Sequence, residues 1–213
     1  MTVRRGGDWG RAGRPPEDLV WFDDDATASE AIVGGRLEFG LRSGDLVTTL
    51  GAGPTSPMVE YPLDVVALES EGRASERALS HVVVRRRRLG WWHPPIVFVM
   101  NAQYLGRWNV APRGHPNDGR VEVVTVSEKM PRRQWWSARR RLTTGTHLPH
   151  PMIHVSSTDV TAVHVPPNSR VDVDGRPWFT TGRHETADVD VRVVGDAVRV
   201  WIGSAHDDVP WSP

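Results

Sequence analysis

The sequence predicts a mainly β fold, either a β-sandwich or a barrel, from three observations. The chain has 213 residues, which is enough to bury a sizeable core without covalent cross-links. From Tyr61 onward, short runs rich in Val and Ile alternate with turn residues. Within that part, Arg132–Leu142 alone has a clear helical pattern. Many short strands with few helices are typical of sandwiches and barrels.

The expected strands are short and bounded by turn formers. They are Leu63–Leu68, His81–Val84, Ile96–Met100, Val121–Val126, Val160–Val165 and Val171–Val173. Two further runs, Val189–Val194 and Ala197–Ile202, flank Gly195-Asp196. Glycine in the first position suits a type II′ turn, and pairing across it sets Val189 opposite Ile202 on an apolar face. We therefore expect a hairpin near the C-terminus.

Two helices are expected. Asp23–Asp25 precede Ala26–Val33, so an aspartate caps a short helix there. The second helix is Arg132–Leu142, which follows a proline. We expect the adjacent Trp135 and Trp136 to belong to the core rather than to an interface.

Composition excludes several classes of function. Cysteine is absent, which rules out disulfides, thiolate metal sites and a cysteine nucleophile. The 26 basic residues balance 26 acidic ones, so no global field indicates nucleic acid. No apolar run reaches the roughly 20 residues of a membrane span. The basic N-terminal segment Met1–Arg14 has no apolar stretch behind it, so we expect no signal peptide and a cytoplasmic protein.

Four motifs follow one another in a recognisable order. They are Asn101-Ala-Gln-Tyr-Leu-Gly106, Asn117-Asp118-Gly119, Gly145-Thr-His147 and Asp174-Gly175. This order resembles the C-terminal β-sandwich domain of the diacylglycerol kinase-like bacterial lipid kinases, a family related to sphingosine and ceramide kinases. The resemblance implies a two-layer β-sandwich with one short helix over residues 41–213. Residues 1–40 then form an N-terminal arm and a reduced α/β fragment.

The family activity implied by the resemblance is phosphoryl transfer from ATP, with Mg²⁺, to a lipid hydroxyl. Asp45 and Asp174 are the implied catalytic carboxylates. The chain departs from the family in two places. First, it has no Gly-Gly-Asp-Gly-Thr loop, and the nearest counterpart of that loop is Ser43-Gly44-Asp45-Leu46. In addition, the family's Asp-Gly-Glu reads Asp174-Gly175-Arg176, which puts a cation where the family has an acceptor. Phosphoryl transfer would then need either a nucleotide domain from a partner in trans or an unrecognised nucleotide site in this chain.

The resemblance also implies a divalent-ion site. The carboxylate of Asp118 and the backbone carbonyls of His115 and Arg120 would hold Mg²⁺ or Ca²⁺, which prefer oxygen ligands. The alternative is an Asx turn that opens the next strand, since Asn, Asp and Gly are good turn formers. Asp174-Gly175 has a similar alternative as the turn of a β-hairpin.

Two other clusters have functional and structural interpretations. His147, His150 and His154 have the spacing of zinc ligands, but the prolines between them forbid a helix, so a packed loop is the alternative. The run Arg85–Arg88, followed by Trp91 and Trp92, suits the tip of a hairpin on an anionic membrane. A solvated turn with the indoles in the core is the alternative.

Two function hypotheses from different classes result. The first is a diacylglycerol kinase-like lipid kinase. The second is a non-catalytic lipid-binding or membrane-docking sandwich, peripheral to the membrane. The partners expected are a lipid or membrane surface, a nucleotide domain in trans, and a second copy paired through a sheet edge. A zinc hydrolase built on the histidines is a third class.

Overall fold

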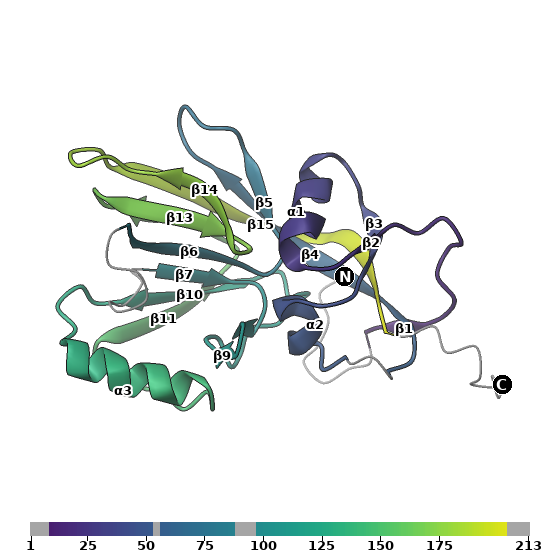
Figure 1. Cartoon of the computed structure of the whole chain (residues 1–213), viewed down its shortest axis with the longest axis horizontal. Helices are drawn as coiled ribbons and strands as arrows, with labels where there is room; N and C mark the ends of the chain where they lie inside the picture. The colour runs from purple at the N-terminus through teal and green to yellow at the C-terminus, as the bar shows by residue number, and fades with distance from the viewer. Residues whose placement is uncertain (1–8, 53–55, 88–96, 204–213) are drawn as a thin grey trace.

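A computed structural model describes residues 9–52, 56–87 and 97–203 (Figure 1). This part of the chain is mainly β and contains three helices, α1 (Asp25–Val33), α2 (Asp45–Thr49) and α3 (Arg132–Leu142). The strands form two packed sheets, so the predicted mainly β sandwich is confirmed and the barrel alternative is wrong. No helix of the described part is long and apolar enough to cross a membrane.

The first sheet contains seven strands within the described ranges. Its path runs β1–β4–β15–β3–β2, with β5 paired to β4 and β12 paired to β15. These strands are β1 (Arg11–Ala12), β2 (Trp21–Phe22), β3 (Glu38–Leu41), β4 (Val59–Glu69), β5 (Glu76–Ala78), β12 (Val160–Val165) and β15 (Ala187–Ile202). β4 and β15 are the longest, and both run through the whole sheet in Figure 1.

The second sheet has the order β11–β10–β7–β6–β13–β14. Its strands are β6 (His81–Arg86), β7 (Val97–Met100), β10 (Val121–Val126), β11 (Ile153–Thr158), β13 (Ser169–Val173) and β14 (Arg176–Thr180). β8 (Tyr104–Leu105) and β9 (Trp108–Asn109) form a separate ribbon. The strands expected from the sequence at 63–68, 81–84, 121–126, 160–165 and 171–173 all lie within these elements. β11 was not expected.

Valine side chains fill the space between the two sheets. Because side chains alternate between the faces of a strand, every second residue of each strand points inward. The buried valines of this layer include Val66, Val82, Val84, Val97, Val99, Val121, Val163, Val171, Val173, Val189 and Val191. The core of the sandwich is therefore built almost wholly from β-branched residues, which the pleated surface favours.

α3 covers the outer face of the second sheet, and its bounds are those predicted from the sequence. Trp135, Ala138 and Leu142 are buried against Phe98 and Val124 of the sheet. Trp136 remains 37% exposed, so the expectation that both indoles belong to the core is wrong for Trp136. Neighbouring helical residues point about 100° apart, so only one of the pair faces the sheet.

The N-terminal fragment packs on one end of the first sheet. β3 pairs in parallel with the end of β15, and α1 and α2 bury Ala28, Ile32 and Leu46 against Leu63 and Val200. α1 begins at an aspartate cap as expected, because Asp24 accepts the N–H of Thr27. In Figure 1 these elements lie at one end of the molecule, with the fan of the second sheet at the other. The boundary after residue 40 stays a prediction.

The predicted C-terminal hairpin is wrong. β15 is one continuous strand, and Gly195-Asp196 lies in a β-bulge where its pairing with β4 shifts between Val194 and Val198. Asp196 has a positive φ of 50°, and its N–H donates to the Asp64 carboxylate of β4 at 2.9 Å. A bulge and a II′ turn both use positive φ, so the local sequence does not separate them.

Candidate functional site

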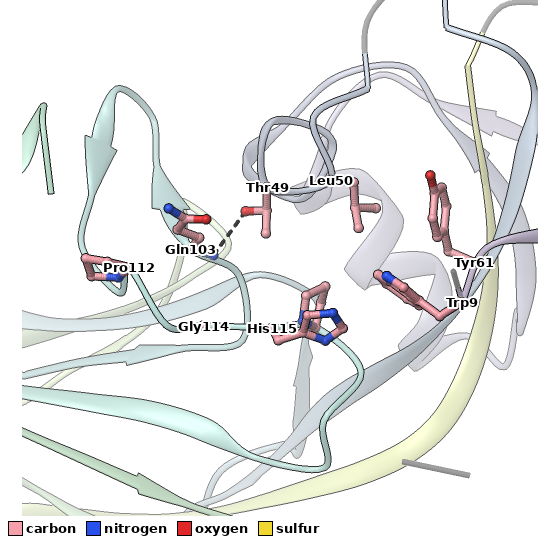
Figure 2. A pocket seen from close by; sticks show the side chains of 9 residues that line it. Trp9, Thr49, Leu50, Tyr61, Gln103, Pro112, Gly114 and His115 are labelled. Carbon is pink, nitrogen blue, oxygen red and sulfur yellow. Dashed lines mark hydrogen bonds between the residues drawn. The ribbon is translucent and has the colours of Figure 1, made fainter. Parts of the chain in front are cut away.

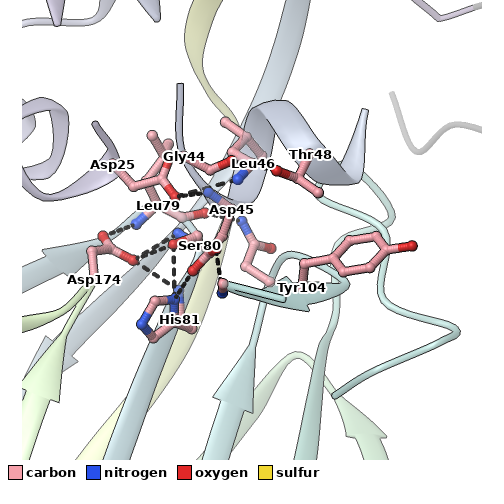
Figure 3. A network of polar contacts seen from close by, with 12 residues as sticks. Asp25, Gly44, Asp45, Leu46, Thr48, Leu79, Ser80, His81, Tyr104 and Asp174 are labelled. Carbon is pink, nitrogen blue, oxygen red and sulfur yellow. Dashed lines mark hydrogen bonds and ion pairs between the residues drawn. The ribbon is translucent and has the colours of Figure 1, made fainter. Parts of the chain in front are cut away.

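Four acidic or histidine side chains meet where α1 and α2 join the sandwich (Figure 3). Asp25 is the first residue of α1 and Asp45 is the first residue of α2. His81 begins β6, and Asp174 follows β13. The structure therefore brings both carboxylates implied as catalytic, Asp45 and Asp174, into one polar network. Asp25 and His81 complete it, although the sequence analysis gave neither a role there.

Asp174 holds two turns together. Val173 pairs with Arg176 across Asp174-Gly175, and both turn residues have positive φ, which confirms the hairpin-turn interpretation. The buried carboxylate accepts four hydrogen bonds from the turn between β5 and β6. The donors are the N–H groups of Leu79 (2.7 Å), Ser80 (2.9 Å) and His81 (2.8 Å) and the hydroxyl of Ser80 (2.7 Å).

Asp45 also binds within the protein through both of its oxygens. Oδ1 accepts the N–H of Gly106 at 2.6 Å, and Oδ2 lies 3.2 Å from Nδ1 of His81. Ser80 Oγ lies 3.0 Å from the same nitrogen. Burial opposes protonation of His81, but the hydrogen bond to Asp45 and the nearby carboxylates outweigh it and raise the pKa of the imidazole. The protonated ring then shares Nδ1–H between Asp45 and Ser80.

Asp25 caps the N-terminus of α2 rather than that of its own helix. Its Oδ2 accepts the N–H groups of Asp45 (2.7 Å) and Leu46 (3.3 Å). Its Oδ1 is buried without a hydrogen-bond partner. Burial, then the charges of Asp174 and Asp45, raises the pKa of Asp25 to about 7. Since Oδ2 already accepts two donors, the proton belongs on Oδ1.

Gly44 allows this close approach. A Cβ atom at residue 44 would lie 2.4 Å from Oδ1 of Asp25, and Gly44 has a φ of +127°. The glycine that the sequence analysis compared with a phosphate loop therefore makes room for an internal carboxylate. In the sequence, Gly44 before Asp45 indicates a tight approach of another group at residue 44. Nothing in that pattern shows that the group is Asp25.

Arg176, the cation that departs from the family motif, forms ion pairs. Its guanidinium lies 3.3 Å from the Glu76 carboxylate of β5 and 3.2 Å from the Glu30 carboxylate of α1. These contacts join β14, β5 and α1 beside the network. The positive charge therefore links the N-terminal fragment to the sandwich.

The loop that precedes β10 contains the predicted metal ligands. Oδ1 of Asp118 accepts the N–H of Arg120 at 3.0 Å, which is the hydrogen bond of an Asx turn. Nδ1 of His115 accepts the N–H of Asn117, and the Arg120 guanidinium binds Ser157. The loop brings His115, Asp118 and Arg120 close together in sequence and space. Their role as Mg²⁺ or Ca²⁺ ligands stays a prediction.

The same loop is fixed to β4 through buried polar groups. Asp64 accepts the N–H of Gly119 at 2.7 Å, and the Asn117 amide donates to the Pro62 carbonyl and to Asp196. Burial raises the pKa of Asp64. These contacts join the loop, β4 and the bulge of β15. From the sequence, Asn117 was expected to be part of a family motif or of a turn, and not to bridge β4 and β15.

The histidines do not form a metal centre. Within residues 9–52, 56–87 and 97–203, no group of three or more His, Asp or Glu side chains is arranged to hold a metal ion. His147 is buried, which lowers the pKa of its imidazole. Nδ1 of His150 accepts the N–H of Met152, and His154 lies on β11. The packed-loop interpretation fits this arrangement.

The arginine run after β6 is partly described. Arg85 pairs with Asp172 at 2.9 Å, and Arg86 pairs with Glu128 and the Pro167 carbonyl. Both therefore bind within the sandwich. Arg88, Trp91 and Trp92 lie outside the described residues.

The described surface includes a smaller pocket and a larger groove. The smaller, of about 260 Å³, lies between the end of α2 and the loop that follows β7, with Trp9 packed on Tyr61 and His115 at its side (Figure 2). The larger is a groove of about 700 Å³ beside β10 and β11. Its lining is Ala111, Pro112, Arg113, Glu122, Gly145, Leu148, Pro149, His150, Ile153, Val155 and Ser157.

Comparison with known proteins supports a fold relationship. No family model matches the sequence, and no curated protein matches it. Solved structures do match, including "A putative diacylglycerol kinase from Bacillus anthracis str. Sterne", with a TM-score of 0.55 and 14% identity over 86% of this chain and 77% of that chain. A second structure of such a protein from the same organism has a TM-score of 0.52 and 13% identity over 85% of this chain and 76% of that one.

The chain has a diacylglycerol kinase-like fold. At such low identity the likeness concerns the fold alone. The fold found in this way is the one that the order of motifs in the sequence implied. The motif resemblance in the sequence, rather than the fold, implies ATP and Mg²⁺, so their fit to these residues matters. A phosphate does not fit at the start of α2, because Asp25 already accepts the N–H groups that an anion would use.

Proposed function

We propose that this chain is a non-catalytic lipid-binding module with a diacylglycerol kinase-like fold. The observation that carries the proposal is that the two carboxylates implied as catalytic, Asp45 and Asp174, already bind groups within the protein. A general base needs an oxygen that the hydroxyl it deprotonates can reach, whereas Asp174 is buried and the Asp45 side chain is only 15% exposed. Asp174 accepts four internal donors, and the oxygens of Asp45 face Gly106 N–H and His81.

The groove beside β10 and β11 supports a lipid as the ligand. Its volume of about 700 Å³ lies in the range of small-molecule sites, which are concave and mostly apolar. Leu148, Ile153 and Val155 offer aliphatic surface for an acyl chain. Arg113 lines the same groove and supplies a positive charge for a phosphate head group.

A filled-groove variant tests lipid binding. Val155→Trp places an indole in the groove, and Val160→Trp is the matched control because Val160 is 55% exposed on β12 of the other sheet. We expect the purified protein to bind monomeric short-chain phosphatidic acid in calorimetry. Val155→Trp should weaken binding at least tenfold, and Val160→Trp should leave it unchanged. Equal binding by all three proteins, or none by the wild type, would contradict the proposed ligand.

A phosphotransfer assay tests the absence of catalysis. We expect no transfer of labelled γ-phosphate from Mg·ATP to a mixed lipid extract. Transfer by the wild type that is lost in Asp45→Ala would overturn the proposal.

One observation favours a second function, lipid phosphorylation with a nucleotide domain supplied in trans. Asp45 and Asp174 come from distant parts of the chain, yet both contact the Ser80-His81 pair. Such convergence of titratable groups is typical of catalytic sites as well as of structural networks. The phosphotransfer assay repeated in a lysate of the source cells separates the two, because only the second function predicts Asp45-dependent transfer there.

A further inference from the structure

Positive charge is concentrated on α3 and the turn before it. The chain as a whole has no net charge, yet Lys129–Leu142 contains six basic residues and no acidic one. They are Lys129, Arg132, Arg133, Arg139, Arg140 and Arg141. A local excess of this size creates a field at one face of a neutral molecule.

The packing of α3 decides where these charges lie. Its apolar side is used, because Trp135, Ala138 and Leu142 are buried on the second sheet. Arg133 and Arg140 are exposed, and their helical positions place them opposite the buried stripe. We define the basic face of α3 as Arg133, Trp136, Arg140 and Arg141, all of which are exposed.

The described residues supply no counter-ion for the three arginines of this face. Within the described part of the chain, no carboxylate forms an ion pair with Arg133, Arg140 or Arg141. This contrasts with Arg85, Arg86 and Arg176, each of which has an acidic partner. The basic face of α3 is therefore available to an external anion.

Trp136 adds an aromatic group to the face. The Arg139 guanidinium lies 5.3 Å from the Trp136 ring and 5.1 Å from the buried Trp108 ring, so cation–π contacts orient the exposed indole. Tryptophan is favoured at membrane interfaces because its ring is apolar and its N–H polar. An indole among exposed arginines suits the head-group region of a bilayer.

We propose that the basic face of α3 docks the protein on an anionic membrane surface. The choice of a lipid surface over a nucleic acid rests on the proposed lipid-binding function. α3 ends at Leu142, and Gly145 already lines the groove. Docking through α3 therefore brings the groove close to the bilayer from which its lipid would enter.

Vesicle sedimentation tests the docking face. The probe is vesicles of phosphatidylcholine and phosphatidylglycerol in equal parts, compared with phosphatidylcholine alone. We expect wild-type protein to bind the anionic vesicles, to bind the neutral ones weakly, and to dissociate as salt is raised. The triple variant Arg133→Gln, Arg140→Gln, Arg141→Gln should bind about 100-fold more weakly, since each basic residue contributes about fivefold near an anionic surface.

A matched triple variant controls for net charge. Arg36, Arg183 and Arg192 are exposed; Arg36 and Arg183 lie in loops and Arg192 lies on β15. Replacing these three by glutamine removes the same charge and should leave vesicle binding unchanged. Equal loss in both triple variants would overturn the docking face. So would wild-type protein that binds neutral vesicles equally, or that leaves anionic vesicles for a competing DNA duplex at the same salt.

The two proposals fail separately in these experiments. The α3 triple variant should still bind monomeric phosphatidic acid in calorimetry, because its groove is intact. Conversely, Val155→Trp should still sediment with anionic vesicles. If Val155→Trp abolishes sedimentation while the α3 triple variant retains it, docking occurs through the groove and the α3 proposal is wrong.

Discussion

Oδ2 of Asp25 accepts the backbone N–H of Asp45 at 2.7 Å, which joins the first residue of α1 to the first residue of α2. The carboxylate occupies the end of α2, where the resemblance to lipid kinases predicts a phosphate-binding loop. A phosphate could use these N–H groups only if Asp25 moved away. The position of this one carboxylate therefore argues against a phosphate site at the N-terminus of α2.

Stability should fall as pH rises from about 4 to 7 because of Asp25. Its pKa is about 7 in the folded protein against an ordinary value of 3.8, so the folded state binds the extra proton in this window. Deprotonation then costs about 4 kcal/mol of folding free energy, fully expressed above pH 7. Asp25→Asn mimics the protonated acid, and urea unfolding at pH 5 and pH 8 should show that it removes most of this decline.

His81 gives a pH dependence of the same sign in a higher window. Its folded pKa is raised above 6.5, so its contribution is complete below pH 6.5 and is lost as pH rises through the folded pKa. The part of the decline that His81 contributes should therefore begin only above pH 6.5 and remain in Asp25→Asn. An unchanged decline between pH 4 and 6 in that variant would contradict the assignment to Asp25.

Asp174→Asn should destabilise the fold strongly. An asparagine oxygen at the Oδ1 position can keep the three donors from Ser80 and His81, but the amide NH₂ group then faces the Leu79 N–H that binds Oδ2. A buried donor without an acceptor costs about 1–3 kcal/mol, and the remaining hydrogen bonds lose the charge that strengthens them. We expect a loss of about 3–5 kcal/mol in urea unfolding. Asp45→Asn is the control variant, because its amide oxygen can still accept the Gly106 N–H. We expect this variant to lose less free energy of unfolding than Asp174→Asn. If the order were reversed, Asp174 would not be the structural member of the pair.

Arg176→Glu restores the residue that the lipid kinase motif carries, and it should destabilise this protein. A glutamate there would face Glu76 and Glu30 instead of pairing with them. We expect a loss of about 1–3 kcal/mol in thermal or urea unfolding. Arg176→Met keeps the aliphatic stem without the charge and should cost less. A stable Arg176→Glu protein would show that α1 does not depend on these ion pairs.

The two neighbouring tryptophans of α3 should respond differently to truncation. Trp135 is 1% exposed, whereas Trp136 is 37% exposed. Trp135→Ala leaves a cavity in the outer layer and should cost about 3–5 kcal/mol. Trp136→Ala should change stability by no more than about 0.5–1 kcal/mol. Circular dichroism during urea unfolding measures both, and similar losses would place Trp136 in the core after all.

The periodicity of apolar residues predicted those helices and strands that bury one face and expose the other. α3, β10 and β12 have the predicted bounds because one face of each packs on a continuous apolar surface. β11 was missed, since His154, Ser156 and Ser157 dilute its apolar residues and only Ile153 and Val155 pack on the apolar cluster around α3. An edge strand with one half-buried face carries too few apolar positions to stand out.

The sequence by itself determined the mainly β class, the aspartate-capped α1, the helix α3 and the motif order of the sandwich, because each depends on interactions between residues close along the chain. Only the tertiary structure decided that Gly195-Asp196 is a bulge, since the Asp64 carboxylate that accepts its N–H lies on a distant strand. It likewise decided that Asp25 caps α2 and that Asp174 binds a turn 93–95 residues away. Such pairings depend on side-chain partners brought together by the packing of the sheets, which no local pattern encodes.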